Sequence, residues 1–483
     1  MLFNSLDFAI FLPIVFLLYW FVANKNLKIQ NLLIVISSYI FYGWWDWRFL
    51  SLIVFSTAVD YLIGVALLKE EHPSKRKLFL WTSIIINLGF LGFFKYYNFF
   101  VDSFVASFSF FGFQIQGNSL DIILPIGISF YTFQTLSYSI DVYRRKLVPT
   151  TDFIAFSAFV CFFPQLVAGP IERATHLLPQ FYSKRKFEYD KAVDGVRQIL
   201  WGLFKKIVIA DNCAEYANII FNNSENYSGS TLALGAILFT FQIYGDFSGY
   251  SDIAIGTSKL FGFDLMQNFR FPYFSRNIAE FWRLLHISLS TWFRDYLYIP
   301  LGGSKGGTWM RIRNTFIIFI VSGFWHGANW TFVIWGFLNA LYILPSIILH
   351  TNRKNVEIVA QGKLFPDLRD LISIIGTFAL TVFAWIFFRA ENVQHAIAII
   401  SEVFSRSLFT IPKFVNQGPF LVTAFLIFIF FIIEWLGREQ KFALEKIATN
   451  WKKSYRLLFY YSIVLIIMVC GNFKENQFIY FQF

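Results

Sequence analysis

The sequence predicts an all-α, polytopic integral membrane protein with about eleven transmembrane helices and further interfacial or re-entrant helices. Three observations support this fold class. Hydrophobic residues make up 56% of the 483 residues and charged residues only 15%, a balance typical of chains that cross a bilayer many times. Uncharged apolar stretches recur along the whole chain. Lysine and arginine gather in short segments between these stretches, as orientation in a bilayer requires.

Six apolar stretches occupy the first third of the chain, and each is near the length of about 20 residues that spans the hydrocarbon core. They are residues 6–23, 31–45, 49–68, 78–94, 122–140 and 153–168. The first is expected to be a permanent span and not a cleaved signal peptide. No basic residue precedes Lys25, and no small-residue cleavage pattern follows the stretch.

The basic residues predict an orientation. The segments after the first, third and fifth stretches carry Lys25 and Lys28, the cluster at 69–77, and the run at 144–146, whereas those after the second and fourth carry little besides Arg48. The positive-inside rule then places the odd segments in the cytoplasm and the N-terminus outside. The net charge of +11 is therefore interpreted as topology and attraction to acidic lipids or an acidic carrier, not as nucleic-acid binding.

The middle of the chain carries charges inside apolar sequence. A helix is expected over 192–210 with Lys205 and Lys206 at its centre, and the apolar residues 232–260 contain Asp246 and Asp252. Carboxylates six residues apart do not share a helical face well. A pair acting on one proton is thus disfavoured, and helix capping or a buried hydrogen bond is expected for each.

Residues 270–314 form an amphipathic and glycine-rich connecting segment. Within it, residues 277–299 are expected to form one amphipathic helix lying in the membrane interface. The glycine pairs at 302–303 and 306–307 predict a flexible turn after this helix.

Residues 315–350 form the catalytic-histidine segment. The segment contains no Asp, Glu, Lys or Arg, holds His326 within it, and is too long for one simple span. We expect an interruption at Ser322-Gly323 and at Gly327. An ionisable side chain at membrane depth is a functional candidate; the alternative is a packing histidine satisfied by a carbonyl or by Asn329.

Three further spans are expected at 371–388, 420–435 and 457–470, and residues 1–483 are expected to form a single membrane-embedded domain. No repeat, linker or low-complexity tract is apparent.

Histidine is the residue type best suited to carry chemistry here. The other four histidines lie in or beside polar segments, whereas His286 and His326 lie among aromatic and aliphatic residues, so two imidazoles are expected near one membrane cavity. No metal is expected, because neither has Cys, Asp or Glu at ligand spacing. No G-x-S-x-G elbow and no phosphate-cradling loop is present. One neutral imidazole suffices for general-base catalysis on a hydroxyl.

Two long motifs resemble the signature segments of membrane-bound O-acyltransferases, and the similarity is greatest to the bacterial alginate O-acetyltransferase-like branch. These motifs are FWRLLHISLSTWFRDYLYIPLGG at 281–303 and SGFWHGANWTFVIWGFLN at 322–339. The resemblance extends to the opening residues, to FFPQLVAGPIERATHLLPQF at 162–181, to QIYGDFSGYSDIAIG at 242–256, and to the closing FIYFQF.

The resemblance implies helices around a transmembrane tunnel in the bacterial inner membrane. It implies transfer of an acyl group, most simply acetyl, from a cytoplasmic thioester to a hydroxyl of a surface polysaccharide or of a partner that delivers it. Coenzyme A or an acyl carrier protein would be the donor, with no permanently bound cofactor. An extracytoplasmic acyltransferase or polysaccharide-biosynthesis partner is implied as well.

The family's essential histidine corresponds to His326 and its second histidine to His286. Relatives often carry W-R-R-W-H before the second histidine, whereas here Arg283 is followed by two leucines. His326 is expected to be the base, and His286 to orient acceptor or donor. Supporting roles are expected for four further residues, namely Trp325 and Asn329 as oxyanion donors, Arg283 and Asp246.

The sequence also allows two competing functions. Interrupted helices with polar residues at mid-depth are also typical of a transporter or flippase. Transfer of D-alanine or of a longer acyl chain would use the same residues, and the width of the tunnel would decide between them.

Overall fold

The computed structural model describes residues 1–414, 417–474 and 478–479, and in this part of the chain every regular element is helical. The fold class is therefore confirmed as all-α. Six helical stretches are long and apolar enough to cross a membrane: Leu27–Lys69, Pro73–Phe110, Trp330–Ile348, Leu368–Arg389, Gly418–Gly437 and Lys453–Cys470. The count of about eleven spans stays a prediction.

The chain divides into two compact units, Met1–Ala192 with Thr257–Met266, and Val193–Gly256 with Gln267–Phe483. Two helices contribute to both units, α9 (Tyr189–Leu203) and α11 (Gly229–Leu260). The expected single membrane-embedded domain over residues 1–483 stays a prediction.

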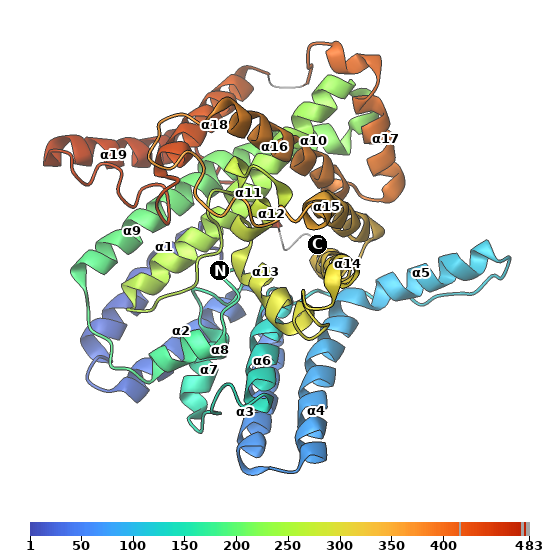
Figure 1. The fold of residues 1–483 in the computed structure, drawn as a ribbon. Helices are drawn as coiled ribbons and strands as arrows, with labels where there is room; N and C mark the ends of the chain where they lie inside the picture. The colour runs from blue at the N-terminus through green and yellow to red at the C-terminus, as the bar shows by residue number, and fades with distance from the viewer. Residues whose placement is uncertain (415–416, 475–477, 480–483) are drawn as a thin grey trace. The chain divides into compact units, whose positions relative to one another are not determined.

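The first unit is a set of packed helices. Its elements are α1 (Leu6–Leu17), η1 (Leu18–Val22), α2 (Leu27–Asp46), η2 (Trp47–Phe49), α3 (Leu50–Lys69), α4 (Pro73–Leu91), η3 (Gly92–Tyr96), α5 (Tyr97–Phe110), α6 (Ile128–Tyr143), α7 (Phe153–Cys161), α8 (Ala174–Leu177) and η4 (Leu178–Phe181). Figure 1 shows α3, α4 and α6 side by side, and these three helices contact one another.

A buried carboxylate joins α3, α4 and α6. Asp60 accepts hydrogen bonds from Ser83 at 2.5 Å, Asn87 at 2.9 Å and Ser139 at 2.8 Å. Such a group inside a bilayer must be satisfied by its neighbours. The sequence analysis did not single out Asp60, because an isolated acid in an apolar run carries no partner pattern.

The sixth predicted span is too long. Helix α7 ends at Cys161, and residues 163–168 form turns. Pro164 explains the early end, because a proline disfavours helical geometry at the residue before it.

The second unit holds the two histidines that the sequence singled out. Its elements are η5 (Phe204–Ala210), α10 (Asp211–Asn222), η6 (Ser224–Asn226), η7 (Pro272–Phe274), α12 (Ile278–Leu284), α13 (Ile287–Phe293), η8 (Arg294–Tyr298), α14 (Gly307–His326), α15 (Trp330–Ile348), α16 (Leu368–Arg389), α17 (Val393–Val403), η9 (Arg406–Phe409), α18 (Gln417–Gly437) and α19 (Lys453–Cys470). The expected single helix over 277–299 is wrong, because the chain breaks at Leu285-His286 between α12 and α13.

Helices α14 and α15 form a tight hairpin and lie side by side in Figure 1. The expected interruption at Ser322-Gly323 is wrong, because α14 continues through both residues to His326. The expected interruption at Gly327 is confirmed as the break between the helices. A Cβ atom at Gly323 would overlap the carbonyl of Phe332 on α15. Small residues of this kind allow membrane helices to pack backbone against backbone.

This packing gives a stability prediction. A Cβ at Gly336 on α15 would overlap the carbonyl of Phe319 on α14, so Gly336→Ala should destabilise the unit by about 1–3 kcal/mol through overpacking. The matched control is Gly376→Ala on α16, where a Cβ would have no neighbour within 4 Å. Alanine favours helix over glycine by about 1 kcal/mol, so the control should be neutral or stabilised. Thermal unfolding in detergent measures both, and equal stability of the two variants would contradict the packing argument.

Candidate active site

His326 is the last residue of α14 and is only 4% exposed. Its ring is surrounded by aromatic side chains from α14, α15 and α16. The ring centroids lie 4.9 Å from Trp325, 5.1 Å from Trp335 and 5.4 Å from Phe388. The Trp335 and Phe388 rings meet the imidazole edge to face, at interplanar angles of 85° and 68°. The imidazole is therefore held in a rigid and largely water-free environment.

His286 occupies the junction between α12 and α13 and is 1% exposed. Its backbone is left-handed, with φ of +47°, a conformation rare for a residue with a Cβ and common at functional sites. Ring atom Nδ1 lies 3.1 Å from Oδ1 of Asn268, which also accepts from the Ser288 hydroxyl at 2.9 Å. An amide oxygen only accepts, so Nδ1 carries the proton and Nε2 of the neutral ring carries the lone pair.

Burial also determines the charge of His286. The residue lies outside the six candidate spans, and desolvation lowers the pKa of its imidazole to about 3. A histidine of this kind is neutral near pH 7. Neutral imidazole is the form that can accept a proton or a hydrogen bond at Nε2.

Trp325 connects the two histidines. Its indole centroid lies 6.0 Å from the His286 ring and 4.9 Å from the His326 ring. Phe247 of α11 closes another side of His286, edge to face at 4.6 Å. The structure thus brings together the two histidines and the tryptophan that were singled out, from α14 and from the junction between α12 and α13.

Asn329 has a role in the turn after His326. Its side-chain oxygen caps α15 by accepting from the Thr331 N–H at 3.0 Å, and its amide donates to the carbonyl of Glu391 at 2.7 Å. In this structure both functional groups of Asn329 are therefore used, one to cap α15 and one to join the hairpin to the segment after α16. A role for Asn329 as an oxyanion donor stays a prediction and would require these bonds to change.

Asp246 belongs to a buried network of charges. Its carboxylate pairs with the Lys206 ammonium at 2.8 Å, and the same ammonium lies 2.8 Å from Asp211. The neighbouring Lys205 pairs with Asp252 at 2.5 Å. Buried charges require such pairing. Both aspartates lie inside α11, which excludes the capping alternative. The other expected role is confirmed, because each accepts a buried hydrogen bond, from Ile479 N–H for Asp246 and from Gln198 for Asp252.

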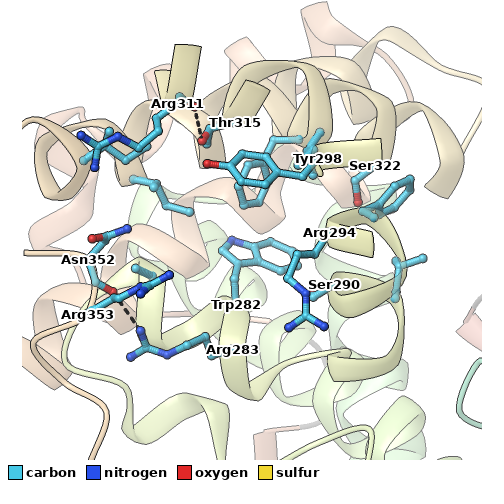
Figure 2. Close-up of a pocket in the computed structure, with 17 residues that line it drawn as sticks. Trp282, Arg283, Ser290, Arg294, Tyr298, Arg311, Thr315, Ser322, Asn352 and Arg353 are labelled. Carbon is cyan, nitrogen blue, oxygen red and sulfur yellow. Dashed lines mark hydrogen bonds between the residues drawn. The ribbon is translucent and has the colours of Figure 1, made fainter. Parts of the chain in front are cut away.

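A cavity of about 350 Å³ lies beside the histidines, and Figure 2 shows its lining. Four arginines surround it: Arg283, Arg294, Arg311 and Arg353. Its apolar wall includes Trp282, Leu289, Phe293 and Phe319, and Ser322 of α14 also lines it. Ser322 lies one helical turn before His326, and Leu289 lies three residues after His286. Neither histidine lines the cavity, but both lie within about one turn of residues that do.

Arg283 contributes to the structure of this cavity. Its guanidinium donates to the carbonyls of Asn352, at 2.8 Å, and Asn355, and Figure 2 shows it at the same edge as Arg353. Three arginines of the cavity, at 294, 311 and 353, were not singled out from the sequence, and neither were Asn268, Trp335 and Phe388. A cluster of four guanidinium groups separated by up to 70 residues has no local pattern.

Comparison with known proteins identifies the family of this chain. The model of the MBOAT, membrane-bound O-acyltransferase, family matches residues 143–377, which include both histidines. A probable alginate O-acetylase of Pseudomonas aeruginosa is 40% identical, with 89% of this chain and 81% of that protein covered. A peptidoglycan O-acetyltransferase of Helicobacter pylori is 35% identical, with 83% and 79% covered. A teichoic acid D-alanyltransferase of Bacillus subtilis is 25% identical, with 57% and 71% covered.

The long apolar helices are those expected of a membrane protein, and the similarity to acyl-transferring relatives extends over most of the chain. The buried pair of histidines about one tryptophan lies in the range that the family model matches. The chain therefore belongs to the membrane-bound O-acyltransferase family and is an O-acyltransferase.

Proposed function

We propose that this chain transfers an acetyl group from a thioester donor to a hydroxyl of a cell-envelope polysaccharide, or to a partner that delivers the group to one. The names of two relatives, an alginate O-acetylase and a peptidoglycan O-acetyltransferase, support acetyl and a polysaccharide. The observation that carries the proposal is the buried His326 at the end of α14, enclosed by aromatic rings one turn from the arginine-lined cavity.

In the proposed step, the acceptor hydroxyl attacks the thioester carbonyl while His326 accepts the hydroxyl proton. A C–O bond forms, the C–S bond breaks, and the thiolate leaves with the electron pair of that bond. The thiolate then takes the proton from the imidazolium, which returns His326 to its neutral form. The products are an ester and a free thiol, so no permanently bound cofactor is needed. His286 orients the acceptor or the donor through Nε2.

The cavity of Figure 2 suits the donor. Coenzyme A and the prosthetic group of an acyl carrier protein both carry phosphate, and guanidinium groups bind phosphate through paired hydrogen bonds. The apolar wall at Phe293 and Phe319 suits an uncharged acyl-pantetheine arm. The thioester would then reach His326 past Ser322.

The proposed enzyme has about eleven spans around a tunnel, lies in the bacterial inner membrane, and has its N-terminus outside. The basic segment at 69–77 would face the cytoplasm, where thioester donors are made. Acceptor chemistry on the other side of the membrane would involve an extracytoplasmic acyltransferase or a polysaccharide-biosynthesis protein as partner.

Transfer of D-alanine is the second candidate, supported by the similarity to a teichoic acid D-alanyltransferase. The third candidate is movement of an unmodified solute, and none of the relatives named above is a transporter. Offering acetyl and D-alanyl thioesters in the same assay distinguishes acetyl transfer from D-alanyl transfer. Solute uptake by vesicles tests the transport function.

The test uses the purified chain in proteoliposomes with a labelled acetyl thioester and an oligosaccharide acceptor. Arg294→Gln and Arg353→Gln should each raise KM for the thioester about tenfold, equivalent to about 1.4 kcal/mol of binding, with a smaller effect on kcat. The control is Arg369→Gln, an exposed arginine of the same unit that does not line the cavity. Unchanged KM in both cavity variants would exclude this donor site, and no transfer by the parent chain to any hydroxyl would exclude the function.

A further inference from the structure

A second cavity, in the first unit, combines three basic residues with aromatic walls. It has a volume of about 540 Å³. Lys184, Arg185 and Lys186 line it together with Trp20, Phe21 and Phe187. The Phe187 ring meets Trp20 edge to face at 5.6 Å, and Trp20 donates its indole N–H to the carbonyl of Leu260 at 2.9 Å. We call this cavity the basic cleft; it has no residue in common with the proposed active site.

Arg185 supplies a buried positive charge to the basic cleft. The residue is 7% exposed, and its guanidinium donates to the side-chain oxygens of Gln30 and Asn31 and to the carbonyl of Gln180. The ring of Phe263 lies 4.8 Å from the guanidinium carbon. All these partners are neutral, and no carboxylate within the described part of the chain lies within 4.0 Å of Arg185. A buried cation with only neutral partners is costly unless an anion compensates it.

The two neighbouring lysines add charge at the rim. Lys184 and Lys186 are both exposed and both line the basic cleft. Lys25 and Lys28 follow the end of η1, three and six residues after Val22. Positive charge thus collects where the first apolar helix ends, and basic residues at the end of a membrane span attract the phosphate groups of acidic lipids.

An exposed apolar stripe leads along α1 and η1 to the basic cleft. Its members are 52–76% exposed and recur at intervals of three or four residues, which places them on one helical face. They are Leu6, Ile10, Ile14, Leu17 and Phe21. Phe21 is both the last member of the stripe and a lining residue of the basic cleft. A ligand that fits both features has an anionic group joined to a long hydrocarbon chain.

We propose that the basic cleft binds the phosphodiester headgroup of an anionic phospholipid, with one acyl chain lying along the stripe of α1. The headgroup phosphate supplies the negative charge that Arg185 lacks, and Lys184 and Lys186 contact it from the rim. The aromatic walls at Trp20 and Phe187 accommodate the glycerol and the start of the acyl chain. A soluble phosphate would satisfy the charge but would leave the stripe and the aromatic walls without a partner.

The experiment measures thermal unfolding and Trp fluorescence of the full chain in detergent with three probes. These are a short-chain phosphatidylglycerol, a phosphatidylcholine with the same acyl chains, and inorganic phosphate. Phosphatidylglycerol should raise the unfolding temperature in a saturable manner, because a ligand that binds only the folded state stabilises it. Phosphatidylcholine should bind at least tenfold more weakly, and inorganic phosphate should not displace the lipid at equal concentration.

The variant is Lys184→Gln/Lys186→Gln, because both side chains are exposed and their replacement leaves the buried Arg185 contacts in place. Phosphatidylglycerol affinity should fall about tenfold or more, whereas Lys77→Gln, an exposed lysine of the same unit away from the basic cleft, should keep it. Equal binding of the two lipids, full displacement by inorganic phosphate, or unchanged affinity in the double variant would each overturn the proposal. Acyl transfer is not part of this readout, so the result does not depend on the proposed function.

Discussion

His326→Ala is expected to reduce acyl transfer about 10²–10⁴-fold, the usual contribution of a positioned general base. The loss should fall on kcat, with little change in KM for the thioester, because the arginine-lined cavity does not include His326. Its ring is enclosed by Trp325, Trp335 and Phe388, and none of these three side chains is a base that could replace it. The measurement is single-turnover transfer from a labelled thioester in proteoliposomes.

Two variants make this result specific. His326→Gln keeps a polar side chain of similar size but cannot accept a proton at neutral pH, so it should be as inactive as the alanine variant while unfolding closer to the parent temperature. His72→Ala removes an exposed imidazole that makes no side-chain capping hydrogen bond at the start of α4, and this variant should be fully active. Full transfer by both His326 variants would show that the imidazole is a packing residue and that the base lies elsewhere.

The fold could be predicted where local pattern determines it. The stretches at 31–45, 371–388, 420–435 and 457–470 each lie inside a helix of the structure, because length and hydrophobicity suffice to define a span. The prediction failed at Ser322-Gly323, where glycine was interpreted as a break. In this hairpin Gly323 instead lets α14 approach the backbone of α15, and a residue's role in helix packing depends on a partner helix that the local sequence does not show.

The site was predicted in part for a similar reason. The proximity of His286 and His326 was predicted from their apolar surroundings, but the break at Leu285-His286 was not, since a left-handed histidine has no local signal. The partners of Asp246 and Asp252 are two adjacent lysines some 40 residues earlier, in η5. The cavity arginines likewise come from α12, η8, α14 and the segment after α15. Such groupings arise only from tertiary packing.

His286 and Asn268 are expected to act as one unit in catalysis. Since Asn268 accepts from Nδ1 of His286, it keeps the neutral ring in the tautomer whose Nε2 can accept a hydrogen bond from the acceptor hydroxyl or another donor. His286→Ala should lower kcat/KM about 10²–10³-fold, in the range found when one positioned hydrogen-bonding group is removed from an active site. Asn268→Ala should cost less, because the ring remains and only its tautomer and orientation are released.

A double-variant cycle tests the coupling. If Asn268 acts through His286, then Asn268→Ala should lower kcat/KM in the parent and change it little in the His286→Ala background, which gives a non-additive cycle. Ser288→Ala is the control, because it removes the other side-chain donor to the Asn268 oxygen and leaves the histidine contact. Thermal unfolding of the four chains of the cycle and of the Ser288→Ala control distinguishes loss of structure from loss of positioning. Additive effects would show that Asn268 supports only the fold around α13, and that His286 finds its orientation from Phe247 and Trp325 alone.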